Sequence, residues 1–249
     1  MKSFFKNVRD YLYLMVKTLK KPQNKDIFFK QVIHEMEDLG VSSLGIVVFI
    51  SVFMGLIITI QMYDNLSTAS IPIPSYFASS ASKTVLILEF CPTIISIILA
   101  GKAGSFIASS IGTMRVTEQI DALEVMGINT ASFLILPKIV ANIIFNPILI
   151  FISFNISILG IMLSSFLIPQ LTWFDILTGL QNPFKDLYYV YAFIKSVFFG
   201  FVIATIPAYY GYNVIGGSLE VGRASTSAVV STSISIIILN LILTKLILG

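Results

Sequence analysis

Long stretches without charged side chains alternate with short charged segments along this chain. Residues 39–63 and 224–244 carry no charge, and residues 187–212 carry only Lys195. A helix of about 20 apolar residues is long enough to cross the hydrocarbon core of a bilayer. The pattern therefore predicts five membrane-spanning helices, over residues 39–63, 84–112, 139–163, 187–212 and 224–244. After the third helix, a partly buried outer loop is expected around Pro169.

The first 38 residues have a different pattern. Apolar residues at helical spacing, such as Tyr11 and Met15, alternate with charged ones, and the pattern resumes after the break Lys21-Pro22-Gln23-Asn24. Basic amphipathic helices of this kind lie in the headgroup plane of a membrane. The sequence therefore divides into interfacial helices over residues 1–38 and a five-helix membrane domain over residues 39–249. A helical hairpin that packs on a partner protein is the alternative interpretation of the first segment.

The composition supports a membrane protein. Hydrophobic residues make up 56% of the 249 residues and charged residues only 12%, with a mean hydropathy of +0.90. A typical soluble domain has about 25% charged residues, so this chain has too little charge to cover a soluble surface. A disordered chain, a nucleic-acid-binding domain and an ordinary cytosolic enzyme are poor interpretations of this composition. The expected fold is an all-α integral membrane protein, with five transmembrane helices preceded by N-terminal interfacial amphipathic helices.

The basic residues predict the orientation of the chain in the membrane. Eight of the 16 Lys and Arg residues lie in the first 38 positions, and Arg115 and Arg223 fall in segments on the same predicted side. Cytoplasmic loops of membrane proteins carry an excess of Lys and Arg. We therefore expect a multi-pass protein with a cytoplasmic N-terminus and a C-terminus on the outer side.

The residue set offers little for catalysis. The chain has one histidine, His34, one cysteine, Cys91, and scattered acids, which do not make a catalytic triad or a metal-ligand pattern. Gly101-Lys102 lacks the upstream glycine and the following Ser or Thr of a phosphate-binding loop. We expect no catalytic residue, metal or cofactor in this chain, and no nucleic-acid partner.

Glu89 is a candidate functional residue because it lies within an apolar stretch, three residues before Pro92. A carboxylate in a membrane span is costly unless it faces a polar cavity, a partner or the interface. Pro92 removes a backbone donor, which predicts a bent region with exposed polar backbone. A pocket residue and a structural hydrogen-bonding residue are both compatible with this pattern.

The second predicted crossing carries small residues every four positions. Ala100, Gly104, Ala108 and Gly112 share one helical stripe. Small residues at this spacing allow helix backbones to approach closely within a bilayer. The stripe therefore predicts a helix-packing surface.

Residues 113–127 form the most informative loop. Val116, Ile120 and Leu123 share one helical stripe, while charged residues line the other faces and Gly127 is the expected C-terminal stop. The pattern predicts a short charged amphipathic helix between two crossings. Such a helix either lies on the membrane or docks into a cytoplasmic subunit, and periodicity alone favours neither.

Several motifs closely resemble one family. They are Gly101-Lys102-Ala103-Gly104, the run Ile111 to Leu123, and Val221-Gly222-Arg223-Ala224-Ser225-Thr226. In these residues the chain resembles the MlaE-like permeases, the membrane subunits of bacterial ABC systems that move lipids together with MCE-domain proteins. The resemblance covers nearly the whole chain from about residue 27.

The resemblance implies a homodimeric permease of the bacterial inner membrane, paired with a separate ATPase that uses ATP and Mg. It implies that phospholipid is held between the subunits and exchanged with an MCE-domain protein on the outer side. The pocket carboxylate of the family matches Glu89, and Gln61 and Tyr63 are the other residues expected to bind substrate. Residues 113–127 match the coupling helix, so the expected ATPase contacts are Arg115, Glu118, Gln119, Asp121 and Glu124.

The chain departs from the family pattern at three positions. Leu88 stands where an arginine can precede the pocket glutamate, Lys102 replaces an arginine, and Asn240 stands where an acid can occur. The first departure makes a Glu–Arg pair in the pocket unavailable.

The function expected from the sequence is that of a permease subunit moving phospholipid between the inner membrane and an MCE-domain partner. The alternative is a non-transporting membrane scaffold that recruits a cytoplasmic partner through residues 113–127. A self-sufficient ion-coupled carrier is a weaker interpretation, because inverted repeats and broken-helix ion sites are not evident.

Overall fold

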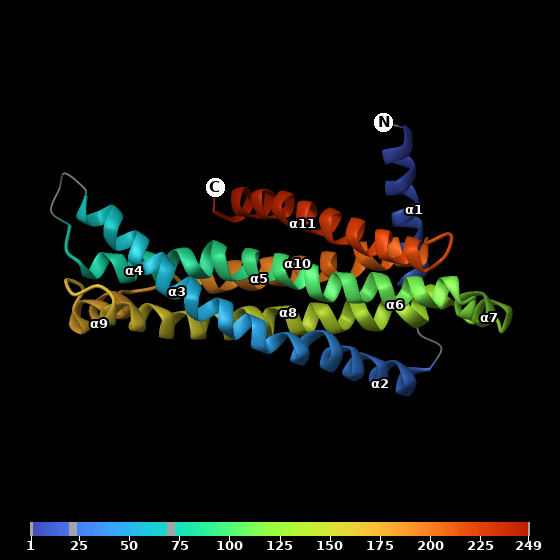
Figure 1. Cartoon of the computed structure of the whole chain (residues 1–249), viewed down its shortest axis with the longest axis horizontal. Coiled ribbons are helices and arrows are strands. Elements are labelled where there is room, and N and C mark those ends of the chain that lie inside the picture. Colours follow the sequence, from blue (N-terminus) through green and yellow to red (C-terminus); the bar gives the residue numbers. More distant parts are fainter. Residues whose placement is uncertain (1, 20–23, 69–72, 249) are drawn as a thin grey trace. The chain divides into compact units, whose positions relative to one another are not determined.

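The chain is helical over most of its length. The computed structural model describes residues 2–19, 24–68 and 73–248, and the side chains of residues 8–19, 24–68 and 73–247. It is 88% helical, and no strand occurs in the described part. Within that part, five helical runs are long and apolar enough to span a membrane: Lys25–Ser67, Tyr76–Val116, Thr130–Phe166, Asp186–Tyr212 and Ser218–Ile247. The predicted all-α membrane fold is confirmed (Figure 1).

The elements follow one another with short connections. The α-helices are α1 (Lys2–Thr18), α2 (Lys25–Glu35), α3 (Leu44–Ser67), α4 (Tyr76–Val85), α5 (Ile95–Leu99), α6 (Ser105–Val116), α7 (Gln119–Val125), α8 (Thr130–Leu163), α9 (Trp173–Gln181), α10 (Asp186–Tyr212) and α11 (Ser218–Leu248). Three π-helical segments, η1 (Met36–Gly40), η3 (Leu86–Ile94) and η4 (Ala100–Gly104), and two 3-10 segments, η2 (Val41–Ser43) and η5 (Ser164–Phe166), lie between them.

Two N-terminal helices are present, but the second does not end at residue 38. The predicted break before it lies outside the described residues except for Asn24, whose side chain accepts hydrogen bonds from the backbone of Asp26 and Ile27 and caps α2. From there α2 continues through η1 and η2 into α3 without a gap. The boundary between α2 and α3 is therefore a local change in helical winding, and no linker separates them.

The second crossing contains the irregular backbone that Pro92 predicts. Residues 76–116 form one helical run, in which η3 contains Pro92 and η4 contains Lys102. Proline cannot donate the hydrogen bond of an α-helix, and single π-helical turns commonly absorb such interruptions. This region places Glu89 on non-α backbone.

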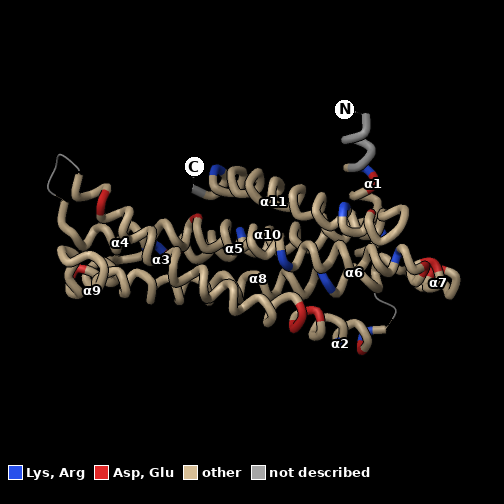
Figure 2. Tube along the Cα trace, viewed as in Figure 1, with Lys and Arg blue, Asp and Glu red and all other residues tan. Residues whose placement is uncertain are grey.

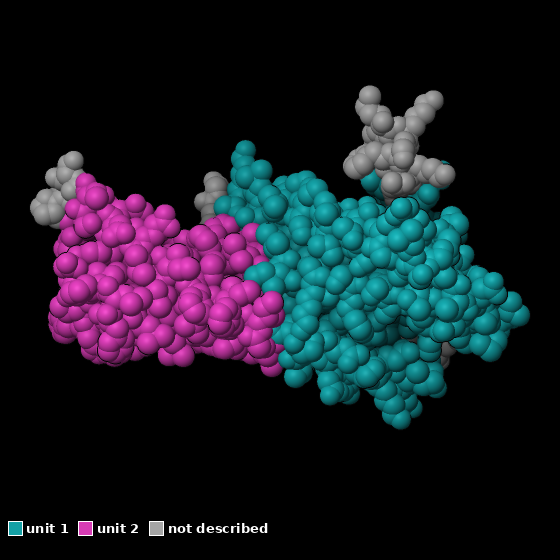
Figure 3. All heavy atoms as spheres, in the orientation of Figure 1, with its two compact units in different colours: residues 1–43, 96–146, 197–249 teal, residues 44–95, 147–196 magenta. Residues whose placement is uncertain are grey.

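The chain divides into two compact units, each assembled from separate stretches of the sequence. The expected division at residue 38 stays a prediction. Unit 1 comprises residues 1–43, 96–146 and 197–249, and unit 2 comprises residues 44–95 and 147–196 (Figure 3). Both α8 and α10 contribute to each unit. Charged residues are sparse along the long helices of both (Figure 2).

Unit 2 is built on close contact between α3 and the second half of α8. A methyl group added at Gly55 would overlap the Ser157 carbonyl, and one added at Gly160 would overlap the Val52 carbonyl. Ser51 adds a hydrogen bond of 2.7 Å to the Ser153 hydroxyl. Because apolar burial does not drive helix association inside a lipid bilayer, small residues and interhelical hydrogen bonds hold this pair together.

Helix α9 of unit 2 is held against α4. Thr172 and Asp175 form a reciprocal capping box at the start of α9, and the Lys83 ammonium donates to the Leu180 carbonyl at 2.8 Å. Ile168 and Leu171 are buried on either side of exposed Pro169. The predicted partly buried loop around Pro169 is confirmed.

Unit 1 packs α6 against α11. The predicted small-residue stripe of α6 and η4 is buried, and a methyl group added at Gly112 would meet the Val221 side chain at 3.1 Å. The Ser225 hydroxyl donates to the Ser105 carbonyl at 3.2 Å. Helix α1 joins the same unit through the Tyr11 hydroxyl, which donates to Thr205 on α10 at 2.9 Å. The stripe is therefore a packing surface, as the sequence predicts.

Candidate functional site

Glu89 belongs to a polar cluster in unit 2 that α10 completes. The Lys195 ammonium donates to Glu89 Oε1 at 2.9 Å and to the Leu88 carbonyl at 3.0 Å. The Tyr191 hydroxyl donates to the same Glu89 oxygen at 3.1 Å. The ammonium also lies 4.4 Å from the centroid of the Tyr191 ring. One carboxylate, one ammonium and one phenol thus form a compact charged site within two membrane-spanning segments.

The two charged partners differ sharply in exposure. The Lys195 side chain has no exposed surface, whereas 37% of the Glu89 side chain is exposed. Here the cation is fixed inside the protein and the carboxylate faces outward, so the group available to a ligand is Glu89.

Local sequence explains why these groups meet. Tyr191 and Lys195 are four residues apart on α10 and therefore lie on one helix face. In an α-helix the Leu88 carbonyl would accept from residue 92, but that residue is Pro92 and has no N–H. The Lys195 ammonium donates to this carbonyl instead.

Lys195 and Tyr191 are candidate site residues that sequence reasoning missed. The signal for Lys195 was its position as the only charged residue within residues 187–212, because a lysine inside a membrane span requires a partner. Leu88 offers no cation beside Glu89. The structure supplies a cation, Lys195, from a different helix, so Glu89 is ion-paired.

An apolar cavity lies in the same unit between η3, α8 and α10. Its volume is about 260 Å³, and its lining includes Ile87, Ile150, Phe154, Ala192 and Ser196. Ile87 precedes Leu88 in the chain, and Ser196 follows Lys195. A polar cluster and an apolar cavity therefore share neighbouring residues of the same two helical segments.

Gln61 and Tyr63, the other two residues expected to bind substrate, lie near the end of α3. Gln61 is exposed and Tyr63 is partly exposed. The hydrogen bonds to Glu89 described above come from two residues of α10. Gln61 and Tyr63 both have exposed surface that a ligand can reach. Their role in binding stays a prediction.

The predicted helix over residues 113–127 is two helices. α6 ends at Val116, Glu118 adopts a left-handed φ of 60°, and α7 begins at Gln119. This turn directs Ile120 into unit 1, where it is fully buried, so one residue of the predicted apolar stripe packs against the rest of the unit. Gly127, with a φ of 78°, ends α7 as predicted: its N–H donates to the Glu124 carbonyl and the N–H of Ile128 to the Leu123 carbonyl.

The outer face of α7 mixes charge with exposed apolar surface. Arg115 closes the turn through a 2.5 Å contact with Asp121. Glu118 and Gln119 are exposed, as are the apolar side chains of Val125 (89%) and Met126 (66%). Exposed apolar side chains beside charges are typical of a surface that binds another protein.

Glu124 points toward the rest of unit 1. Its Oε1 accepts hydrogen bonds from the Tyr212 hydroxyl at 3.0 Å, from the Thr130 hydroxyl at 3.0 Å and from the Lys17 ammonium at 3.4 Å. The Tyr212 hydrogen bond is the largest cause that lowers the pKa of Glu124, with Thr130 and Lys17 adding to it. Burial acts to lower the pKa of Lys17, but Tyr212 and Glu124 outweigh it and the net shift is upward. Glu124 therefore links α7 to α1, α8 and α10.

Within the described part of the chain, no three His, Cys, Asp or Glu side chains gather as a metal site requires. The fold and these two regions define a multi-pass α-helical membrane protein with a charged site inside the membrane and an exposed connecting helix. The family model Permease MlaE matches residues 32–246. The chain belongs to the MlaE permease family.

The chain has relatives in several lineages. A probable ABC transporter permease protein of Rickettsia bellii is 34% identical, covering 88% of this chain and 84% of the relative. A probable ABC transporter permease protein of Synechocystis is 32% identical over 87% of this chain and 81% of its own. The chloroplastic protein TRIGALACTOSYLDIACYLGLYCEROL 1 of Arabidopsis thaliana is 30% identical over 88% of this chain and 62% of its own. The chain is an ABC transporter permease of this family.

Proposed function

We propose that this permease moves phospholipid between the bacterial inner membrane and an MCE-domain partner. A separate ATPase, which uses ATP and Mg, powers the movement. The observation that carries the proposal is the Glu89–Lys195 pair. In this pair an accessible carboxylate is ion-paired to a buried cation inside a membrane-spanning segment. Charged residues inside a membrane are expensive and mark substrate pathways by default.

The site matches the two parts of a phospholipid. The exposed Glu89 carboxylate accepts hydrogen bonds from donors of a headgroup, while Lys195 holds that carboxylate in place and offsets its charge. The cavity of about 260 Å³ beside it is lined by apolar side chains and suits a segment of acyl chain. Gln61 and Tyr63 are proposed as further contacts to the lipid.

Coupling to the ATPase is assigned to the surface formed by Arg115 and α7. Glu118, Gln119 and Asp121 provide polar contacts, and Val125 and Met126 provide the apolar centre of the interface. Glu124 has the complementary role, because its hydrogen bonds pass a displacement of α7 to α1, α8 and α10.

The complete transporter is proposed to contain two copies of this chain, with the N-terminus in the cytoplasm and the C-terminus in the periplasm. The excess of Lys and Arg in the first 38 residues supports this orientation. A reporter fused after Gly249 is expected to behave as periplasmic. A cytoplasmic reporter would contradict the orientation and the number of crossings.

Substitution of Glu89→Gln tests the lipid site. The amide oxygen of glutamine still accepts from Lys195 and Tyr191, so the fold and ATPase capture should survive, while the lipid extracted per purified protein falls severalfold. Glu220→Gln is the matched control, because Glu220 is also ion-paired, to Arg223 at 2.7 Å, and its side chain is 42% exposed.

Three outcomes would count against the proposal. Unchanged lipid content in Glu89→Gln would remove Glu89 from the lipid site. Loss of the folded protein without a separable lipid defect would make Glu89 a structural residue. A wild-type protein that captures an ATPase but carries no lipid would favour the scaffold alternative.

A further inference from the structure

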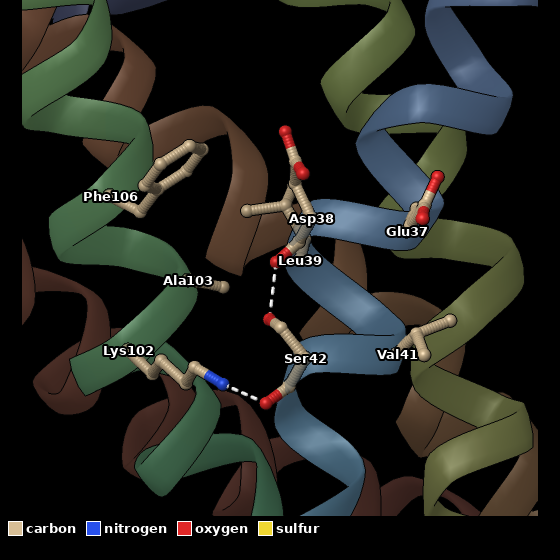
Figure 4. A pocket seen from close by; sticks show the side chains of 8 residues that line it. All are labelled: Glu37, Asp38, Leu39, Val41, Ser42, Lys102, Ala103 and Phe106. Carbon is tan, nitrogen blue, oxygen red and sulfur yellow. Dashed lines mark hydrogen bonds between the residues drawn. The ribbon is translucent and has the colours of Figure 1, made fainter.

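A second cavity, in unit 1, shares no residue with the Glu89 cluster. It has a volume of about 550 Å³ and lies between the segment η1–η2 and the segment η4–α6. Lys102 and Phe106 come from one wall, and Asp38 and Ser42 come from the opposite wall (Figure 4). The volume is within the range of about 300–1,000 Å³ that is typical of small-molecule sites.

The charges of this cavity are of both signs. Lys102 is the single basic residue of the lining, and its ammonium donates to the Ser42 carbonyl across the cavity. An ammonium has three donors, so the group retains capacity for a ligand. Glu37 and Asp38 are the two acids of the lining, both exposed, and His34 approaches Asp38 at 3.4 Å. The lining therefore has one positive and two negative side chains.

The cavity lies at a transition in the chain. The segment before it, α2, carries charged residues, and from Leu39 onward the sequence is apolar as α3 begins. A helical run that changes from charged to apolar crosses from the headgroup layer into the hydrocarbon layer at that point. The ligand present at highest concentration at such a position is a lipid headgroup.

We propose that this cavity binds the headgroup of a zwitterionic phospholipid that carries a primary ammonium. The lipid phosphate contacts the Lys102 ammonium, and the lipid ammonium contacts the Asp38 carboxylate, with Glu37 as the second acid of the lining. Leu39, Ala103 and the Phe106 ring provide apolar contact for the glycerol region. An anionic lipid binds more weakly, because the two acids repel it and one lysine does not offset them.

Photo-crosslinking of the purified full chain in phosphatidylcholine nanodiscs tests this site. The probe is phosphatidylethanolamine with a photoreactive group near the glycerol end of one acyl chain, compared with phosphatidylglycerol carrying the same group. Adducts are mapped by mass spectrometry to residues 37–42 and 102–106. Adducts on residues 87–89 and 189–196 report the Glu89 region in the same sample, so the two sites are read separately.

We expect the ethanolamine probe to label residues 37–42 and 102–106 in preference to the glycerol probe. Lys102→Gln should lower this labelling about tenfold at subsaturating probe, the change that one lost charge-assisted hydrogen bond produces. Labelling near Glu89 should not change. Lys30→Gln is the control, because Lys30 is an exposed lysine of α2 outside the lining.

A second variant keeps the test decisive if Lys102→Gln fails to fold. Asp38 is exposed, so Asp38→Asn leaves the packing intact and should remove most of the preference for ethanolamine over glycerol. The proposal is overturned if either folded variant labels like the wild type, or if the two probes label equally. It is also overturned if soluble phosphoethanolamine, at the concentration of the probe, abolishes the labelling, because the occupant is then a solute.

Discussion

The unequal burial of Glu89 and Lys195 predicts that removing the glutamate destabilises the protein more than removing the lysine. Glu89→Leu leaves the fully buried Lys195 ammonium with the Leu88 carbonyl and no carboxylate, and breaking a buried pair in this way costs about 3–5 kcal/mol. Lys195→Met removes the buried charge itself. The remaining carboxylate is 37% exposed and keeps the Tyr191 hydrogen bond, so we expect a cost of about 1–2 kcal/mol.

The double variant Glu89→Leu/Lys195→Met separates pairing from packing. It removes both charges, so it should be more stable than Glu89→Leu alone by about 2 kcal/mol, since a buried pair replaced by apolar side chains is often close to neutral. The measurement is the free energy of unfolding of the four proteins in detergent micelles, followed by circular dichroism during denaturant titration. The reasoning is refuted if Lys195→Met is as destabilising as Glu89→Leu, or if the two effects simply add.

Three further predictions concern other parts of the chain. Reversal of both Glu118 and Asp121 to Lys should weaken ATPase capture severalfold in a pull-down while membrane insertion survives; each exposed contact is worth about 1 kcal/mol or less, so the double change is required. The pKa of Glu124 is lowered mainly by a tyrosine hydrogen bond. Its contribution to docking of α1 is therefore present above the ordinary glutamate pKa of about 4.3 and is lost as the pH falls through the lowered value. A spin label on α1 should become mobile in acid, and Glu124→Gln should abolish that pH step. Gly55→Ala should destabilise by about 1–3 kcal/mol because the methyl group overlaps a carbonyl of α8, whereas Gly45→Ala, which meets open space, should be neutral or slightly stabilising in the same unfolding assay.

Most of the fold could be predicted from charge spacing. Uncharged stretches are visible in sequence because the hydrocarbon core excludes charge, and each of the five predicted crossings overlaps one long helical run. Two further features could be predicted, because each follows from the covalent structure of the residues concerned. They are the small-residue stripe at Ala100 to Gly112 and the irregular backbone at Pro92.

Element boundaries and cross-helix partners could not be predicted. No residue pattern between α2 and α3 predicts that the helix continues through π and 3-10 turns. Such winding depends on packing, for example of Gly40 against the Phe145 ring. The break at Glu118 requires a left-handed residue that is not glycine, which sequence patterns do not signal. The partnership of Glu89 with Lys195 joins residues 106 positions apart and depends on helix rotation.

ATP-dependent lipid transfer by the reconstituted transporter tests the central claim most directly. The chain is incorporated into liposomes with its ATPase and MCE-domain partner, and movement of labelled phospholipid between the membrane and the MCE-domain protein is followed with and without ATP. We predict transfer that requires ATP, falls at least tenfold in Glu89→Gln and is retained in Glu220→Gln, with ATPase assembly unchanged in both. Transfer that is absent from the wild type, or equal in Glu89→Gln and wild type, would contradict the account.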